Sequence, residues 1–222
     1  MKNFIAKKIL PALLLLLIGT GAFAQNAPFR NEILQYKKID SIQAVPANPI
    51  VFIGSSSLRL WKNLPGAFPG YPVVNRGFGG SAIPHVDRYA EDILFPYKPA
   101  QIVFYCGEND LTEKGVTGDS VYYRFRNLFQ KIRERLPDVP FVFVALKPSP
   151  SREALMPQVK RANGLIAMFL SEQPNTAFID VFSKMINSEG KPMRNLFGPD
   201  MLHMNSDGYQ LWKDMLAPVL LK

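Results

Sequence analysis

Short runs of consecutive apolar residues recur along the chain, separated by longer stretches whose apolar residues repeat every three or four positions. The runs predict strands buried on both faces of a sheet, and the stretches predict amphipathic helices. We expect strands at 50–53, 72–74, 101–105, 140–146 and 176–181, and helices at 29–43, 84–94, 119–136, 151–171 and 205–216. Such alternation predicts an α/β fold with a parallel sheet, whose sites form at the carboxyl ends of the strands.

Two helix starts carry candidate caps. Ser151, followed by Glu153, is expected to begin the helix at 151–171. Asn205 and the two residues after it are expected to cap the last helix, because a side-chain oxygen can accept from the unpaired amides of a first turn.

The first 24 residues have the pattern of a secretory signal peptide. Lys2, Lys7 and Lys8 precede an apolar run at 9–18, and a small-x-small cleavage site follows at 22–24. The alternative is an uncleaved membrane anchor, but the run is shorter than the roughly 18 residues that a spanning helix needs. We therefore expect an exported protein, periplasmic or secreted, with one domain at 25–222 and no stable membrane insertion after cleavage.

Composition narrows the choice of partners. The formal net charge of +8 is spread along the chain, so no basic stripe indicates a nucleic-acid partner. Two separated histidines and the single Cys106, which we interpret as a buried thiol, make a zinc site improbable. The sequence predicts no metal and no cofactor.

A serine-rich block, Gly54-Ser55-Ser56-Ser57, follows the first predicted strand. Glycine permits a sharp turn that would present a hydroxyl at the start of the next helix. The alternative is an ordinary serine cap. The block is not the Gly-x-Ser-x-Gly elbow of α/β-hydrolases.

A carboxylate and an imidazole, Asp200 and His203, precede the last predicted helix. Residues three apart share one face of a helical turn, so this carboxylate could orient this base. A serine nucleophile needs such a base and such an orienting partner. The other histidine, His85, has no acidic partner at this spacing and is interpreted as a surface or packing residue.

Two further blocks could stabilise a tetrahedral oxyanion. Residues 75–81 follow the second strand and include Gly79 and Gly80, whose bare backbone amides can approach an oxyanion closely. Residues 107–110 follow the third strand and include Asn109, whose side-chain amide is a neutral donor. The alternatives are an ordinary glycine-rich loop and an Asn/Asp turn.

The order and placement of these four blocks resemble the SGNH hydrolases, also called GDSL-type esterases and lipases. The resemblance covers roughly 50–216, including the Gly208-Tyr209 pair after the histidine. It implies a flavodoxin-like three-layer α/β/α sandwich with a parallel sheet of about five strands. It also implies ester hydrolysis without a cofactor.

The resemblance implies a role for each matched residue. Ser56 matches the nucleophile, His203 the base and Asp200 the orienting carboxylate. Gly80, Asn109 and the Ser56 backbone N–H match the oxyanion hole.

The sequence departs from the family pattern at three positions. Ser55 stands in place of the usual aspartate of Gly-Asp-Ser-Leu, which leaves Ser55, Ser56 and Ser57 to be distinguished. The Gly79-Gly80 doublet leaves a one-residue ambiguity, and Ser81 stands where an aspartate often follows.

These observations predict a serine esterase acting on short acyl esters, most simply acetyl esters on carbohydrate. The alternatives are a lysophospholipase or lipase-like acylhydrolase, and a non-catalytic glycan-binding protein of the same fold. We expect binding loops at 59–69, 78–84, 111–118 and 147–152. In these loops Trp61, Phe68 and Phe78 could stack on a sugar ring. The expected substrate is a small-molecule or glycan ester.

Overall fold

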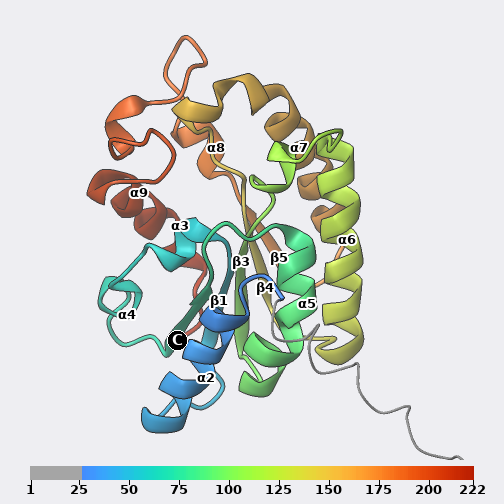
Figure 1. Ribbon diagram of the computed structural model, residues 1–222, viewed down its shortest axis with the longest axis vertical. Coiled ribbons are helices and arrows are strands. Elements are labelled where there is room, and N and C mark those ends of the chain that lie inside the picture. The colour runs from blue at the N-terminus through green and yellow to red at the C-terminus, as the bar shows by residue number, and fades with distance from the viewer. Residues whose placement is uncertain (1–26) are drawn as a thin grey trace, which may run out of the picture.

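A computed structural model describes residues 27–222 and contains one five-stranded, all-parallel sheet (Figure 1). Its strands are β1 (Ile50–Gly54), β2 (Val73–Gly77), β3 (Gln101–Tyr105), β4 (Phe141–Val144) and β5 (Thr176–Ile179). All four strand pairings are parallel, in the order β2-β1-β3-β4-β5. The predicted α/β class is confirmed. The predicted signal peptide, 1–24, lies outside the described residues.

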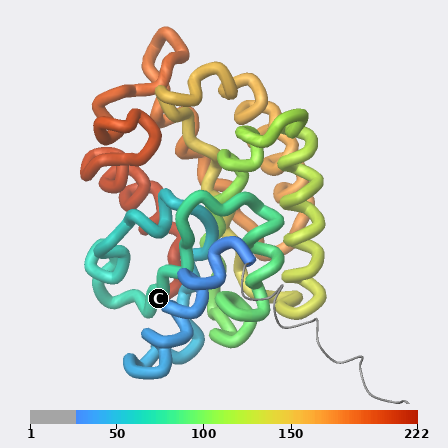
Figure 2. Tube along the Cα trace, in the orientation of Figure 1, coloured from blue at the N-terminus to red at the C-terminus, as the bar shows by residue number. Residues whose placement is uncertain are grey.

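Helices cover both faces of the sheet, as Figure 1 shows. They are α2 (Arg30–Ile42), α3 (Ser56–Arg59), α4 (Leu64–Ala67), α5 (Ile83–Ile93), α6 (Gly118–Arg135), α7 (Met156–Ser171), α8 (Val181–Lys184) and α9 (Ser206–Leu216). In Figure 2 the C-terminal segment, in red, returns beside the segment that follows β1.

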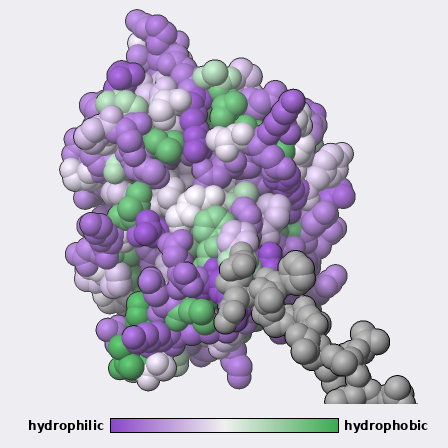
Figure 3. Space-filling model, viewed as in Figure 1, coloured by the Kyte–Doolittle hydropathy of each residue, from purple (hydrophilic) through white to green (hydrophobic). Residues whose placement is uncertain are grey.

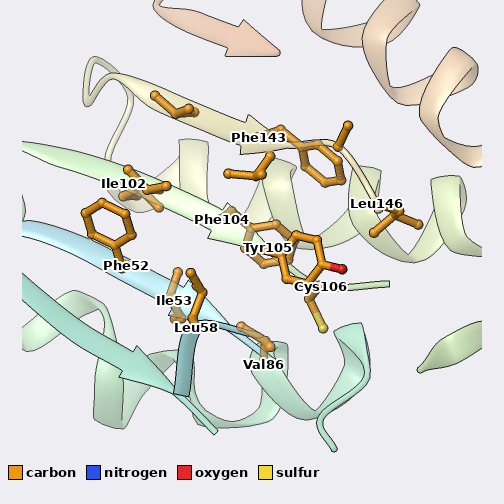
Figure 4. Close-up of a cluster of buried hydrophobic side chains, with 14 of the residues drawn as sticks. Phe52, Ile53, Leu58, Val86, Ile102, Phe104, Tyr105, Cys106, Phe143 and Leu146 are labelled. Carbon is orange, nitrogen blue, oxygen red and sulfur yellow. The ribbon is translucent and has the colours of Figure 1, made fainter. Parts of the chain in front are cut away.

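Alternating side chains on β3 show which helices lie on which face. Phe104 contacts Phe125 of α6, with ring centroids 5.7 Å apart, and lies beside Phe143 of β4. Tyr105 points the other way and meets Trp212 of α9 at 4.7 Å. Figure 4 shows Phe104, Tyr105 and Phe143 within this buried cluster. Both faces of β3 are therefore covered by aromatic side chains, which explains why the strand is continuously apolar from Ile102 to Tyr105.

The chain changes direction across the sheet at β1, since β2 lies on one side of β1 and β3 on the other. Open α/β sheets bind ligands in the crevice at such a switch point. At Gly54, with a φ of 147°, a Cβ atom would lie 1.9 Å from the Tyr105 carbonyl oxygen. The Ser55 N–H donates to that same carbonyl at 2.9 Å. Glycine thus allows the ends of β1 and β3 to meet at the switch point.

The helix expected at 151–171 begins later than predicted. A 3-10 turn, Pro150–Leu155, precedes α7, and inside it Arg152 departs from helical geometry with φ −123° and ψ 28°. The Ser151 N–H donates to the Met201 carbonyl at 2.9 Å, so Ser151 belongs to a loop contact and not to a helix cap. By contrast, Asn205 does cap α9, because its side-chain oxygen accepts from the amides of Asp207 and Gly208.

Gly54→Ala is expected to destabilise the fold by about 3 kcal/mol, because the added methyl group meets backbone that cannot yield. Gly164→Ala, inside α7 with open space around its Cα, is the matched control and should stabilise by roughly 0.5–1 kcal/mol. Urea unfolding measures both changes. Equal stability of the Gly54→Ala variant and the unsubstituted protein would contradict the close approach of β1 to β3.

Candidate active site

The three serines after β1 have different surroundings. The side chains of Ser55 and Ser57 are buried, with 3% and 2% of each residue exposed. Ser56, the first residue of α3, is half-buried and lines an open cleft. Among these three hydroxyls, only that of Ser56 can meet a ligand from solution.

Ser56, His203 and Asp200 form a row of hydrogen-bonded side chains. The Ser56 Oγ lies 3.0 Å from His203 Nε2. The other ring nitrogen, Nδ1, lies 2.6 Å from Asp200 Oδ2. The two ends of the row are far apart in sequence and meet because α9 packs beside α3, where the Tyr209 hydroxyl donates to the Ser57 carbonyl at 2.9 Å.

The Asp200–His203 segment is a tight turn and not the helical turn that we expected. Met201 has a left-handed φ of 54°. Asp200 Oδ1 accepts from the backbone N–H groups of Leu202 and His203, at 3.0 and 2.9 Å. One carboxylate oxygen thus fixes the turn while the other contacts the imidazole. The carboxylate therefore reaches the imidazole three residues away without a helical turn.

These contacts also set the ionisation of Asp200. Its modest burial raises the pKa of the carboxyl, but the N–H donors of His203 and Leu202 and the His203 side chain lower it more, to about 2. The carboxylate therefore stays negative across the physiological range and can stabilise a positively charged imidazole.

The glycine doublet differs in its hydrogen bonds. The Gly79 N–H donates to Glu32 Oε1 at 3.4 Å, and that carboxylate also pairs with Arg59 at 2.7 Å. The Gly80 N–H has no hydrogen-bond partner within residues 27–222, and Gly80 adopts a left-handed φ of 74° at the cleft wall. Of the two amides, that of Gly80 is the one left available.

Both polar atoms of the Asn109 side chain, Nδ2 and Oδ1, form hydrogen bonds. Its Nδ2 donates to the Ser81 carbonyl at 3.0 Å, and its Oδ1 accepts from Arg152 Nη2 at 3.0 Å. Ser81 is fully buried, and its hydroxyl lies 3.2 Å from the Gly54 carbonyl oxygen. Ser81 therefore joins the loops that follow β1, β2 and β3.

A cleft of about 410 Å³ connects these groups. Its lining includes Ser56, Gly79, Gly80, Asn109 and His203, which the sequence singled out as site residues. Arg59, Leu60 and Arg152 also line it and lie in the loops expected at 59–69 and 147–152, whereas no residue of the loop expected at 111–118 does. Glu32 and Leu202 complete the lining, and neither was predicted. A larger cavity of about 610 Å³, around Asp40 and Lys98, contains none of the predicted site residues.

The prediction that three aromatic side chains in the loops could stack on a sugar ring is wrong. Trp61, Phe68 and Phe78 are 7%, 2% and 0% exposed and belong to the hydrophobic core. Phe68 stacks on Phe52 of β1, with ring centroids 5.8 Å apart. Apolar rings in loops beside a sheet reduce their contact with water by packing inward, and these rings are unavailable to a sugar.

The remaining candidate groups lie outside the row. His85 Nδ1 accepts from the Ala82 N–H at 3.0 Å, its ring contacts Phe29, and burial lowers its pKa, so it is a packing residue. Cys106 is fully buried, and burial raises the pKa of its thiol.

Within 27–222, no group of three or more His, Cys, Asp or Glu residues could hold a metal ion. The helices within residues 27–222 lack the combination of length and hydrophobicity that a membrane-spanning segment needs.

A serine, a histidine and a carboxylate in hydrogen-bonded sequence, at the carboxyl edge of a parallel sheet, are the arrangement of a serine hydrolase. The chain belongs to the GDSL-like lipase/acylhydrolase family, whose model matches residues 40–211.

Solved structures share the fold at low sequence identity. A protein from Streptococcus pneumonia named for platelet activating factor is 21% identical, with a TM-score of 0.74 over 86% of this chain and 92% of that one. A GDSL-like lipase from Bacteroides thetaiotaomicron is 17% identical, with a TM-score of 0.70 over 84% and 95%. An acetyl-xylooligosaccharide esterase from Geobacillus stearothermophilus is 15% identical, with a TM-score of 0.64 over 81% and 98%. No curated protein matches the chain significantly.

The Asp200 carboxyl is expected to titrate at about pH 2 in the folded protein. Because this pKa lies below the ordinary value of about 3.9, the carboxylate favours the folded state above about pH 4, and this contribution is lost as the pH falls towards 2. A carbon-13 NMR titration of labelled aspartates measures the pKa, and Asp200→Asn identifies the signal. Titration near pH 4 would contradict the hydrogen bonding described here.

Proposed function

We propose that the protein is an exported serine esterase that cleaves short acyl esters, acetyl esters on carbohydrate among them. The observation that carries the proposal is the Asp200–His203–Ser56 row, which opens on a cleft whose lining includes the charged side chains of Glu32, Arg59 and Arg152. Export rests on the charged, apolar and small-residue pattern of residues 1–24. The non-catalytic alternative is disfavoured, because a binding protein has no need of an aligned nucleophile and base.

In the first step Ser56 Oγ attacks the ester carbonyl carbon while His203 Nε2 takes the hydroxyl proton. Asp200, ionised and in contact with Nδ1, holds the tautomer that leaves Nε2 free to accept and stabilises the imidazolium that forms. The tetrahedral intermediate then collapses, and the imidazolium returns the proton to the departing alcohol. Water repeats the cycle on the acyl-enzyme and releases the acid.

Three donors are proposed for the developing oxyanion. The Ser56 N–H is the first amide of α3, and first-turn amides have no carbonyl partner within their own helix. The Gly80 N–H and one N–H of Asn109 complete the set, since both residues line the same cleft as Ser56. Gly80 is preferred to Gly79 because Glu32 already engages the Gly79 amide.

The cleft supports a short acyl group. Besides the proposed catalytic residues, its walls carry the charged groups Glu32, Arg59 and Arg152, with Leu60 and Leu202 as aliphatic side chains. A fatty acyl chain needs a longer apolar surface than two leucines provide. On the face drawn in Figure 3, hydrophobic residues are scattered among hydrophilic ones, whereas an extended apolar patch is typical of lipid contact.

A tagged fluorophosphonate is expected to label the purified protein once, on Ser56. Ser56→Ala should abolish both labelling and hydrolysis of p-nitrophenyl acetate. Ser55→Ala and Ser57→Ala are matched controls that should retain both, because their buried hydroxyls do not face the cleft. Peptide mass spectrometry locates the adduct, and an adduct on Ser55 or Ser57 would refute the assignment.

The ratio kcat/KM should fall along a series of p-nitrophenyl esters from acetate to long-chain esters, because within residues 27–222 Leu60 and Leu202 are the only aliphatic side chains that line the cleft. Acetylated oligosaccharides should be substrates, and EDTA should leave the rates unchanged. A ratio that climbs steadily with chain length would favour the lysophospholipase or lipase-like alternative. Loss of activity in EDTA, restored by a divalent metal, would contradict the cofactor-free mechanism.

A further inference from the structure

A buried charged cluster lies directly behind Asn109. Its centre is Glu108, which is 5% exposed. This carboxylate accepts from Lys147 Nζ at 2.7 Å, from Ser149 Oγ at 2.6 Å and from the Tyr105 hydroxyl at 2.8 Å. Burial raises the pKa of the Glu108 carboxyl, but the charges of Lys147 and Arg152 outweigh this effect and lower it overall. Glu108 is thus a fixed anion whose partners are already in place.

Arg152 links this cluster to the cleft. Its Nη1 donates to Glu108 Oε1 at 3.3 Å, and its Nη2 donates to Asn109 Oδ1 at 3.0 Å. The guanidinium is planar, so anchoring one end on Glu108 directs the other end at the neighbouring residue. The adjacent Ser151 N–H bonds to the Met201 carbonyl, which ties this loop to the turn that carries His203.

These contacts allow only one orientation of the Asn109 amide. In the observed orientation Oδ1 faces a cation and Nδ2 faces the Ser81 carbonyl. A flipped amide would place its NH₂ group against the Arg152 guanidinium and its oxygen against that carbonyl. Both contacts would be repulsive. The second N–H of the observed amide has no hydrogen-bond partner among the described residues.

The charge of Arg152 also affects the donor strength of that N–H. A hydrogen bond from a cation to an amide oxygen draws electron density toward the oxygen and polarises the whole amide. The remaining N–H then becomes a stronger donor. Since Lys147 already pairs with Glu108, the carboxylate does not cancel both cations.

We propose that Arg152 is a positioning residue, which uses Glu108 as an anchor to fix and polarise the Asn109 amide so that its free N–H serves the oxyanion. The proposal rests on the proposed esterase function. It predicts that Arg152 lowers the barrier through Asn109 and not through contact with the substrate.

A double-mutant cycle with Arg152→Met and Asn109→Ala tests the kinetic claim on the full-length protein. Asn109→Ala should lower kcat for p-nitrophenyl acetate by about 10²–10³-fold, as expected for one lost oxyanion donor. Arg152→Met should lower kcat by about 10–100-fold with KM nearly unchanged. The double variant should be no slower than Asn109→Ala alone, because both changes remove one function. Additive losses, an unchanged kcat, or a loss confined to KM would overturn the proposal.

Arg161→Gln is the matched control. Arg161 lies on α7 and pairs with Asp119 at an exposed site, so its loss should leave kcat and the melting temperature unchanged. Arg152→Met should also fold, because Glu108 keeps Lys147, Ser149 and Tyr105 as partners.

Nitrogen-15 relaxation of the Asn109 side-chain NH₂ group tests the positioning claim without a substrate. This NH₂ should become more mobile in Arg152→Met and stay rigid in Arg161→Gln, with Asn109→Ala identifying its signal. Unchanged mobility in Arg152→Met would overturn the proposal whatever the enzyme hydrolyses. Increased mobility in a protein that hydrolyses no ester would leave the positioning in place and refute the esterase function instead.

Discussion

The close approach of β1 to β3 at Gly54 is the constraint on which the rest of the site depends. Any side chain there would overlap the Tyr105 carbonyl, which instead accepts a hydrogen bond from the Ser55 N–H. The chain leaves the sheet in a sharp turn immediately after this contact. That turn buries Ser55 and Ser57 and leaves Ser56 at the cleft, which is why one hydroxyl of three is available for chemistry.

Separate chain segments converge at the carboxyl edge of the sheet, and buried polar contacts hold them together. Ser81 contacts the Gly54 carbonyl through its hydroxyl and accepts from Asn109 and Cys106 through its own carbonyl. Besides the loops that follow β1, β2 and β3, the turn that carries His203 also reaches this edge. A hydrogen bond from the Gly198 N–H to the His203 carbonyl, at 2.8 Å, holds this turn. In a water-accessible cleft, such buried supports keep the exposed reactive groups in one geometry.

Much of the fold could be predicted from the sequence because strands buried on both faces are continuously apolar. The strand at 101–105 illustrates this, since the predicted and observed bounds coincide and four of its five residues, Ile102 to Tyr105, are apolar. The start of α7 could not be predicted in the same way, because the Ser151 N–H donates a hydrogen bond to the carbonyl of Met201, which is distant in the sequence. The contact between Asp200 and His203 was expected, but the turn that makes it depends on a left-handed Met201.

The rest of the cleft depends on tertiary contacts that leave no local signal. Glu32 reaches it from α2, and no motif marks this residue. Arg152 lies in the loop expected at 147–152, but nothing in the sequence shows that it contacts Asn109. The prediction that Trp61 could stack on a sugar failed for a related reason. The composition of a loop does not show which side of the loop faces the core, and this ring packs against Tyr209.

A crystal structure of the fluorophosphonate adduct would test the central claim most directly. The account predicts a covalent bond from phosphorus to Ser56 Oγ, with the phosphoryl oxygen about 2.7–3.1 Å from the Ser56 N–H, the Gly80 N–H and Asn109 Nδ2. An adduct on another residue would contradict the account. So would a phosphoryl oxygen that points to solvent or to Gly79.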